Sequence, residues 1–171
     1  MAFVRIKKIK GNEYAYLVQN KWRKAKGKSP KQKVKAYLGR VYRLIKEKEI
    51  DFWETVDSEP ENYLKFATKE KILNDLVRFE LLKHGFVNLY GKWVNNNIKV
   101  DIDKKKVVNE TKSECVLKIN EGHMCGYRIK KILAYEPDGP IEETGYELAR
   151  LFIESGIDVP QEVFIGYYEK L

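Results

Sequence analysis

The 171-residue chain has little cysteine, no long hydrophobic run and, in one segment, no acidic residue. Its two cysteines, Cys115 and Cys125, are too few for a disulfide framework. No stretch approaches the roughly 18–20 apolar residues that a membrane-spanning helix needs, and the N-terminal residues lack the apolar region of a signal peptide. We therefore expect a cytoplasmic protein in a reducing compartment, with no membrane partner.

The missing acids give the strongest signal in the sequence. Residues 20–40 hold nine Lys or Arg and no Asp or Glu, and residues 1–46 hold fifteen basic side chains against one acid, Glu13. That segment has a net charge of +14, whereas residues 47–171, with 18 basic and 24 acidic side chains, carry −6. Such a one-sided charge repels itself, so it predicts a polyanionic partner such as nucleic acid. A solvated face that opposes aggregation and docking on an acidic protein are the alternatives.

The rest of the composition favours a folded domain. With 43% hydrophobic residues the chain can bury a core, and its length suits one domain, with or without a small appended module. Because the charge changes sign within residues 44–59, we expect a basic β module over residues 1–46 and an acidic body over residues 47–171. Frequent Lys, Glu and Ile with only three Gln are typical of a thermophile-like protein.

The basic module is predicted to be a three-stranded antiparallel β-meander. Its strands are separated by the turn residues Gly11-Asn12 and by a Gly/Ser/Pro-containing loop, and they cover residues 3–10, 13–23 and 31–39. Alternation in the third strand predicts one side formed by Lys31, Lys33, Lys35 and Tyr37 and the other by Val34, Ala36 and Leu38. The second strand is ambiguous, and we expect its Tyr14 and Tyr16 to belong to the core.

The body is predicted to be mainly α-helical with a short β-hairpin, which makes the fold class α+β. The predicted helices cover residues 60–66, 69–84, 121–134, 142–155 and a last segment that opens at Pro160. Thr68 and Asn120 are the expected N-caps, and Gly85 and Gly156 the expected stops. Short strands are expected in residues 86–94 and 97–110, the second of these turning at its lysines.

The basic residues form a candidate nucleic-acid interface. Each Lys or Arg that displaces counterions from phosphates gains entropy, and alternate strand residues repeat at about 6.6 Å, close to the phosphate spacing along one strand. Lysine outnumbers arginine eleven to four in residues 1–46, which favours backbone contact over base reading. The aromatic faces of Tyr16, Trp22 and Tyr37 would stack on bases of a single-stranded target. The predicted contacts are Arg5, Lys7, Lys8, Lys10, Lys21, Trp22, Arg23, Lys24, Lys26, Lys28, Lys31, Lys33, Lys35, Tyr37 and Arg40.

The segments "GNEYAYLV" and "KQKVKAYLG" also carry a resemblance to a known family. Residues 3–40 resemble the N-terminal β module of DDE-type insertion-sequence transposases, with its patterns G-x-x-Y-x-Y-L-V and x-Q-x-V-x-x-Y-L-G. The matching positions are Gly11, Tyr14, Tyr16, Leu17, Val18, Gln32, Val34, Tyr37, Leu38 and Gly39. The resemblance implies DNA as the partner. It does not imply strand transfer, because a long catalytic domain follows in that family and residues 41–171 are too few and too helical for one. The remainder resembles no named family beyond an archaeal type of protein.

One set of residues in the body imitates a nuclease site. Asp101 with Glu110 and Lys112 matches the D…(D/E)xK pattern, in which carboxylates hold Mg²⁺ and a lysine assists the attacking water, and Asp103 would share a strand face with Asp101. Short matches of this kind arise easily in a chain that is 34% charged. A magnesium-dependent nuclease therefore stays an alternative only.

A second set imitates a zinc site. Cys115, His123, Cys125 and His84 include every cysteine and histidine of the chain, but they lack the paired C-x₂₋₄-C spacing of structural zinc sites. Free cysteines of this kind are usually buried and pack as small hydrophobic residues. We expect no metal, no cofactor and no catalysis.

The sequence therefore predicts a non-catalytic nucleic-acid-binding protein, with DNA preferred because of the resemblance. A structured-RNA or ribosome-associated protein is the close alternative, and a protein–protein adaptor is a further one. The body would stabilise the module, form a homodimer or bind a protein partner.

Overall fold

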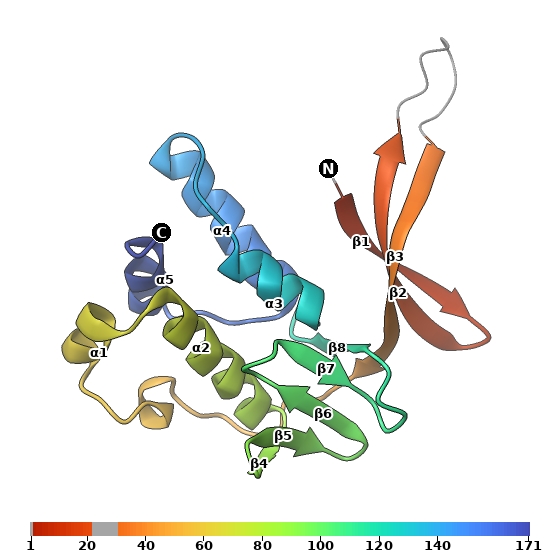
Figure 1. The fold of residues 1–171 in the computed structure, drawn as a ribbon. Coiled ribbons are helices and arrows are strands. Elements are labelled where there is room, and N and C mark those ends of the chain that lie inside the picture. Colours follow the sequence, from red (N-terminus) through yellow and green to blue (C-terminus); the bar gives the residue numbers. More distant parts are fainter. Residues whose placement is uncertain (1, 22–30) are drawn as a thin grey trace.

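The computed structural model describes residues 2–21 and 31–171, which form five α-helices and two β-sheets (Figure 1). This agrees with the predicted α+β class. Within these residues no helix has both the length and the apolar character needed to cross a membrane.

The larger sheet, here called sheet A, contains the predicted meander and two strands of the body. Its order is β1-β2-β3-β8-β9. The bounds are β1 Ala2–Ile9, β2 Asn12–Lys21, β3 Lys31–Arg43, β8 Cys115–Ile119 and β9 Gly122–Met124. β1, β2 and β3 pair antiparallel as predicted, whereas β3 and β8 pair in parallel and β9 folds back on β8. The basic segment and the body thus share one sheet.

The smaller sheet, sheet B, corrects the prediction of a single short hairpin in a mainly helical body. Its four strands run in the order β4-β5-β6-β7, with bounds β4 Val87–Leu89, β5 Lys92–Asn95, β6 Ile98–Asp101 and β7 Lys106–Val108. Tight turns join the strands, and Tyr90, Asn96 and Lys105 adopt positive φ in them. Ile98 and Val100 are buried while Lys99 between them is exposed, which is the alternation of a half-buried strand.

Four of the five predicted helices form close to where the sequence places them. The helices are α1 Pro60–Phe66, α2 Lys69–Lys83, α3 Gly126–Leu133, α4 Ile141–Ser155 and α5 Gln161–Tyr168. Thr68 caps α2 as predicted, because its hydroxyl oxygen accepts the Lys71 N–H at 3.1 Å. Gly156 ends α4 with φ +75°, a left-handed conformation that favours glycine.

The predicted helix over residues 121–134 is wrong in its first part. Residues 115–119 and 122–124 are strands β8 and β9, and Asn120 forms the tight turn between them with φ +45° instead of capping a helix. Asparagine tolerates this left-handed conformation better than most residues, which suits a hairpin turn as well as a cap. Helix α3 begins only at Gly126.

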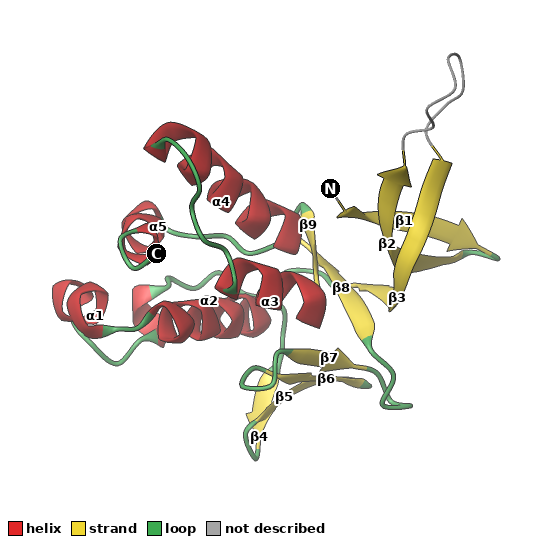
Figure 2. Ribbon diagram, turned by 45° about the horizontal axis from the view of Figure 1, so that its top comes forward, coloured by secondary structure: helices red, strands yellow, loops and turns green. Residues whose placement is uncertain are grey.

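The hydrophobic core lies mainly within the body. It joins the helices to sheet B and to β8 through fully buried side chains such as Ile72, Leu76, Val100 and Leu117. Phe52, from the segment where the charge changes sign, also packs into this core. A second, smaller cluster links sheet A to the start of α3 and consists of Ala15, Leu38, Val41, Val116 and Cys125. Beyond it, the outer parts of β2 and β3 stand away from the helices (Figure 2), whereas the start of β1 lies beside α3 and α4.

Candidate nucleic-acid interface

Sheet A has two unlike faces, and the strand register defines them. Tyr16 in β2 lies opposite Arg5 in β1 and opposite Tyr37 in β3. Because alternate residues of a strand share a face, the neighbours two residues along lie on the same side. We call this side the tyrosine face; its residues include Phe3, Arg5, Lys7, Asn12, Tyr14, Tyr16, Val18, Gln32, Val34, Tyr37 and Arg40. The inner face carries Ala15 and Leu17 and packs on the smaller core cluster.

The basic row predicted on β3 is formed only in part, because two β-bulges interrupt the strand: Lys31 and Lys33 share a face, but not with Tyr37. The pairing with β2 skips Leu38 and Lys35. Tyr37 therefore pairs with Tyr16, whereas Lys33 pairs with Gln19, which points to the other face of β2. The prediction that one side holds Lys31, Lys33, Lys35 and Tyr37 and the other Val34, Ala36 and Leu38 is wrong. A shift of one residue exchanges the two faces of a strand.

Three tyrosines form the centre of the exposed face. The ring centroid of Tyr37 lies 5.3 Å from that of Tyr16 and 6.4 Å from that of Tyr14, with tilted planes. Tyr37 is 55% exposed. Tyr14 and Tyr16 are only partly buried, so the expectation that they belong to the core is wrong. Burial and the neighbouring tyrosines raise the pKa of Tyr37, which keeps its hydroxyl neutral.

Cations border these rings on the same face. The Lys7 ammonium lies 5.1 Å from the centroid of the Tyr16 ring. The Arg40 guanidinium lies over the Tyr42 ring at 5.3 Å and donates to Asn12 Oδ1 at 2.7 Å, which fixes its direction. Arg5 donates to the side-chain oxygen of Gln32 across the sheet. These interactions hold three of the predicted cations beside the aromatic surface.

The other predicted contacts are distributed around the sheet. All nine predicted cations in the described part of the chain are exposed: Arg5, Lys7, Lys8, Lys10, Lys21, Lys31, Lys33, Lys35 and Arg40. Lys10 lies in the β1–β2 turn, and Lys21 and Lys31 face each other across β2 and β3. Trp22, Arg23, Lys24, Lys26 and Lys28, with the predicted basic loop, lie outside the described residues.

The one acid of the basic segment is not on the tyrosine face. Glu13 lies on the inner side and pairs with Arg43 at 2.8 Å. This hydrogen-bonded guanidinium holds the pKa of Glu13 below its usual range. No carboxylate from residues 2–21 or 31–46 therefore neutralises Arg5, Lys7 or Arg40. Like charges that face each other across a sheet, as Lys21 and Lys31 do, are destabilising without a counter-charge.

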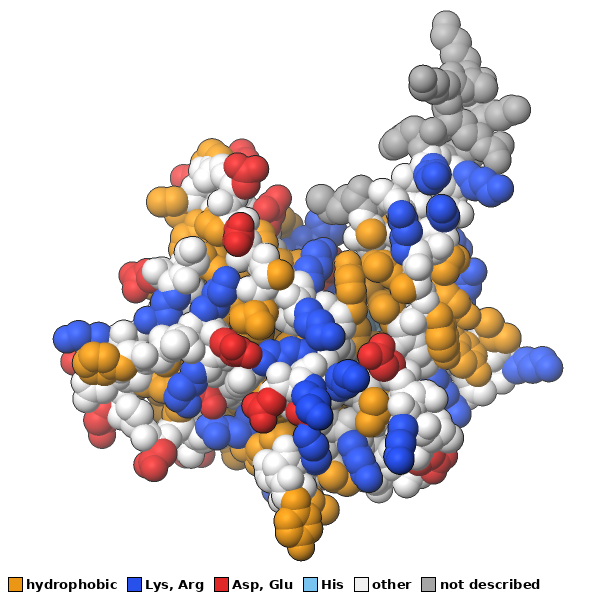
Figure 3. Space-filling view, viewed as in Figure 1, with side chains coloured by type: hydrophobic (Ala, Val, Ile, Leu, Met, Phe, Trp, Pro, Cys, Tyr) orange, Lys and Arg blue, Asp and Glu red, His pale blue; other side chains and the backbone are white. Residues whose placement is uncertain are grey.

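The surface colours match this separation of charge. In Figure 3, Lys and Arg side chains surround the outer end of β2 and β3 and continue below α3 over the part of the body near β7. Acidic side chains lie mostly over the helical end of the molecule, around α1 and α4. A hydrophobic band separates the basic side chains at the two ends of the meander.

Of the nuclease-like residues, Asp101 has partners within the fold. Asp101 ends β6, where its carboxylate accepts the Lys104 N–H at 3.1 Å and pairs with Lys92. Burial opposes ionisation of Asp101, but the Lys92 and Lys104 hydrogen bonds outweigh it and lower the pKa. Asp103 lies in the turn after β6, and Glu110 and Lys112 lie between β7 and β8.

The zinc-like residues are packed into the fold. Cys115 and Cys125 are buried free thiols, and burial raises the pKa of Cys115 to about 12. His84 is buried, with Nδ1 2.8 Å from the Glu80 carbonyl oxygen. Across residues 2–21 and 31–171, no three side chains of His, Cys, Asp or Glu are grouped so that they could hold a metal ion.

Sequence reasoning placed Tyr14 and Tyr16 on one face of their strand and offered Tyr16 for base stacking, but it favoured the core for both and missed Phe3. The i, i+2 spacing of Phe3 and Arg5 was the available signal for Phe3. Asn12 and Gln32 act through hydrogen bonds to arginines from other strands, which no local pattern reveals. Comparison of the chain with protein-family models, curated proteins and solved structures found no significant match.

Proposed function

We propose that this protein binds nucleic acid on the tyrosine face and catalyses no reaction there. The observation that carries the proposal is the cluster of exposed Tyr37 with the partly buried Tyr14 and Tyr16, bordered by cations and by no carboxylate of the basic segment within the described residues. Bases would stack on the rings, and Arg5, Lys7 and Arg40 would contact phosphates.

The chemistry of this face favours a strand with unpaired bases. Base stacking on aromatic side chains tolerates any sequence, because every base has a π face, and it requires bases that are not already paired. The lysines around the face add backbone contact without reading bases. Single-stranded DNA and the single-stranded loops of structured RNA both meet these conditions. The resemblance of residues 3–40 to the transposase module favours DNA.

A binding assay with matched variants tests the proposal. Affinities for single-stranded DNA, duplex DNA and hairpin RNA would be measured across a salt series. Tyr37→Ala should weaken binding to single strands by about 5- to 150-fold, since one stacked base contributes roughly 1–3 kcal/mol. Tyr146→Ala, which removes a 72% exposed tyrosine from α4, should leave binding unchanged.

The contribution of the cations to binding is tested with a second set of variants. Changing Arg5 and Lys7 together to Gln should reduce the slope of log affinity against log salt, by about 0.7 for each phosphate of a single strand that the variant no longer neutralises. Lys99→Gln, an exposed lysine of sheet B, should not change that slope. Absence of binding to all three nucleic acids at low salt would refute the proposal. It would favour an acidic protein as the partner of the basic segment.

A further inference from the structure

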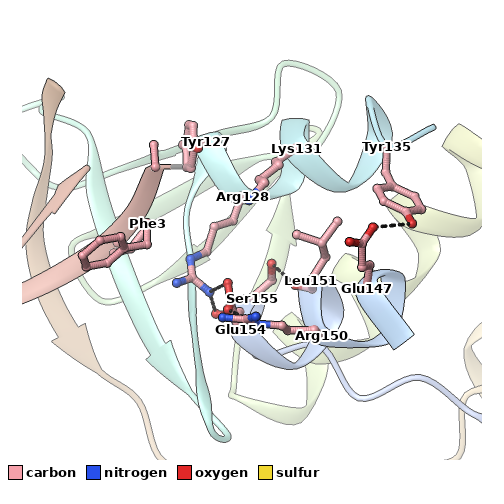
Figure 4. Close-up of a pocket in the computed structure, with 12 residues that line it drawn as sticks. Phe3, Tyr127, Arg128, Lys131, Tyr135, Glu147, Arg150, Leu151, Glu154 and Ser155 are labelled. Carbon is pink, nitrogen blue, oxygen red and sulfur yellow. Dashed lines mark hydrogen bonds and ion pairs between the residues drawn. The ribbon is translucent and has the colours of Figure 1, made fainter. Parts of the chain in front are cut away.

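A pocket lies on the other side of the β1 edge from the tyrosine face. It has a volume of about 250 Å³, and β1 residues 2–4 form one wall while α3 and α4 form the others (Figure 4). The Phe3 ring points away from the Arg128 guanidinium (Figure 4). The apolar part of the lining comes from Phe3, Val4, Tyr127 and Leu151, with charged residues around them. This volume is slightly below the roughly 300–1,000 Å³ of typical ligand pockets, so it suits one compact ligand at most.

Arg128 is the unusual residue of this pocket. It is 9% exposed, and its Nη1 donates to the Glu154 carbonyl oxygen at the end of α4. Nε is buried without a hydrogen-bond partner, and no acceptor among the described residues bonds Nη2. The Glu154 carboxylate is 3.6 Å from Nη1 and also accepts from Arg150 Nε at 2.9 Å. One carboxylate is thus shared by two guanidinium groups, which leaves donors available for a second anion.

The remaining lining combines cations with aromatic rings. Lys131 and Arg150 border the pocket from α3 and α4. At the far end, the Tyr135 hydroxyl donates to the Thr144 carbonyl oxygen at 2.9 Å, and the Glu147 carboxylate lies 3.2 Å from the same hydroxyl. Tyr127 and Tyr135 are partly buried and both line the pocket, Tyr135 at the end near Glu147 (Figure 4). Apolar and aromatic walls with a few cations suit a ligand that has a planar body and an anionic group.

The position of the pocket connects it with the proposed interface. Tyr37, Tyr16 and Arg5 form one row across β3, β2 and β1. β1 is the edge strand of sheet A, and its first residues line the pocket. A strand that crosses the tyrosine face along this row leaves the sheet at the β1 edge. Its end would then reach Arg128, Lys131 and Arg150.

We propose that this pocket binds a nucleoside monophosphate unit, with the phosphate on Arg128, Lys131 and Arg150 and the base against the tyrosine-lined wall. The unit comes either from a free nucleotide or from the phosphorylated end of a strand on the tyrosine face; only the second source rests on the proposed function. Arginine and lysine make their strongest hydrogen bonds to phosphate oxygens, so the terminal phosphate dominates recognition.

The test compares adenosine 5′-monophosphate with adenosine, and ten-nucleotide DNA with and without a 5′- or 3′-phosphate. Arg128 also holds the end of α4, so the variants are Lys131→Gln and Arg150→Gln, with Lys130→Gln as control. Lys130 is an exposed neighbour on α3 that does not line the pocket. We expect the phosphate to improve affinity about tenfold in the wild type and in Lys130→Gln, and much less in the two pocket variants.

Each outcome separates the two proposals. Phosphate-dependent binding of the mononucleotide that disappears in Lys131→Gln supports the pocket, even if no oligonucleotide binds and the proposed function fails. Oligonucleotide binding that requires Tyr37 but gains nothing from a terminal phosphate, with no binding of the mononucleotide, overturns the pocket and leaves the tyrosine face intact. Equal losses in Lys130→Gln and Lys131→Gln indicate general attraction to a basic surface and also overturn it.

Discussion

Replacing Glu80 by Gln should destabilise the protein more than any other isosteric change of one charged group on α2. The Glu80 side chain is fully buried. Its Oε1 accepts from Lys83 Nζ at 3.0 Å and from the Asp158 N–H at 2.9 Å, and its Oε2 accepts from Asn120 Nδ2 at 3.0 Å. One carboxylate therefore ties α2 to the β8–β9 turn and to the segment between α4 and α5.

The size of the effect follows from these partners. A Gln amide has one oxygen and one NH₂ group, whereas all three partners of the Glu80 carboxylate are donors. In one orientation the NH₂ would face the Asn120 amide, and in the other it would face Lys83 and the Asp158 N–H. Lys83, whose side chain is 4% exposed, would keep only Asp158 as a counter-charge. Burial works to lower the pKa of Lys83, but Glu80 and Asp158 outweigh it and raise the pKa. Removing one partner of such a buried pair costs about 3–5 kcal/mol, and we expect about 3 because Asp158 remains.

Urea unfolding of Glu80→Gln, compared with Glu49→Gln as a matched control, measures this loss of stability. Lys46 and Glu49 have the same i, i+3 spacing, but the Glu49 side chain is 86% exposed, so Glu49→Gln should change the free energy of unfolding by less than about 0.5 kcal/mol. The double variant Glu80→Gln/Lys83→Met should recover part of the loss, with a coupling energy of about 1–3 kcal/mol. A decrease of less than about 1 kcal/mol in Glu80→Gln, or no coupling, would refute the reasoning.

Three further predictions concern single residues. Gly39→Ala should lower the free energy of unfolding, measured in urea, by more than about 2 kcal/mol. Gly39 has φ +120°, and a Cβ there would overlap the Glu114 carbonyl oxygen. An unchanged urea midpoint of unfolding would contradict this prediction. Burial and nearby cations lower the pKa of His123 to about 4. Between pH 6.5 and 4 the unfolded chain therefore binds more protons at this residue than the folded protein does. The free energy of unfolding should fall by roughly 1–3 kcal/mol as the pH falls through that range. His123→Gln should reduce this loss, and an identical pH profile would contradict it. Cys115 and Cys125 should not react with a thiol reagent at pH 8 until the protein is unfolded, since burial raises the pKa of both; rapid reaction of the native protein would be the contrary result.

The helices were predictable because their signals are local. Thr68 at the start of α2 and Gly156 at the end of α4 act within one turn of the helix they limit, so the sequence alone identifies them. Asn120 shows the limit of that approach. The same residue type caps helices and makes tight turns, and what selects the turn is its bonds to Glu80 and to the Gly156 carbonyl oxygen, both distant in sequence.

The candidate site was predictable in composition but not in arrangement. The charge count alone identifies the cations, and the nine in the described residues are exposed. Which of them share a face depends on the two bulges at Lys35 and Leu38, and these result from pairing with β2, not from the residues of β3. Unbroken alternation assigns Lys33 to the side of Tyr37, and the bulge at Lys35, which lies between them, shifts Lys33 to the other side.

The parallel pairing of β3 with β8 has a consequence for how the chain folds during synthesis. Residues 40–43 find their partners only at residues 115–118, after sheet B and two helices have been made. The pairings of β1 with β2 and of β2 with β3 are local, so we expect them to form early. One edge of β3 then stays unpaired until β8 has been synthesised. An open edge of this kind recruits other strands, and the many cations of the nascent segment oppose that. A fragment that ends before β8 is therefore expected to associate through β3 once salt screens its charge.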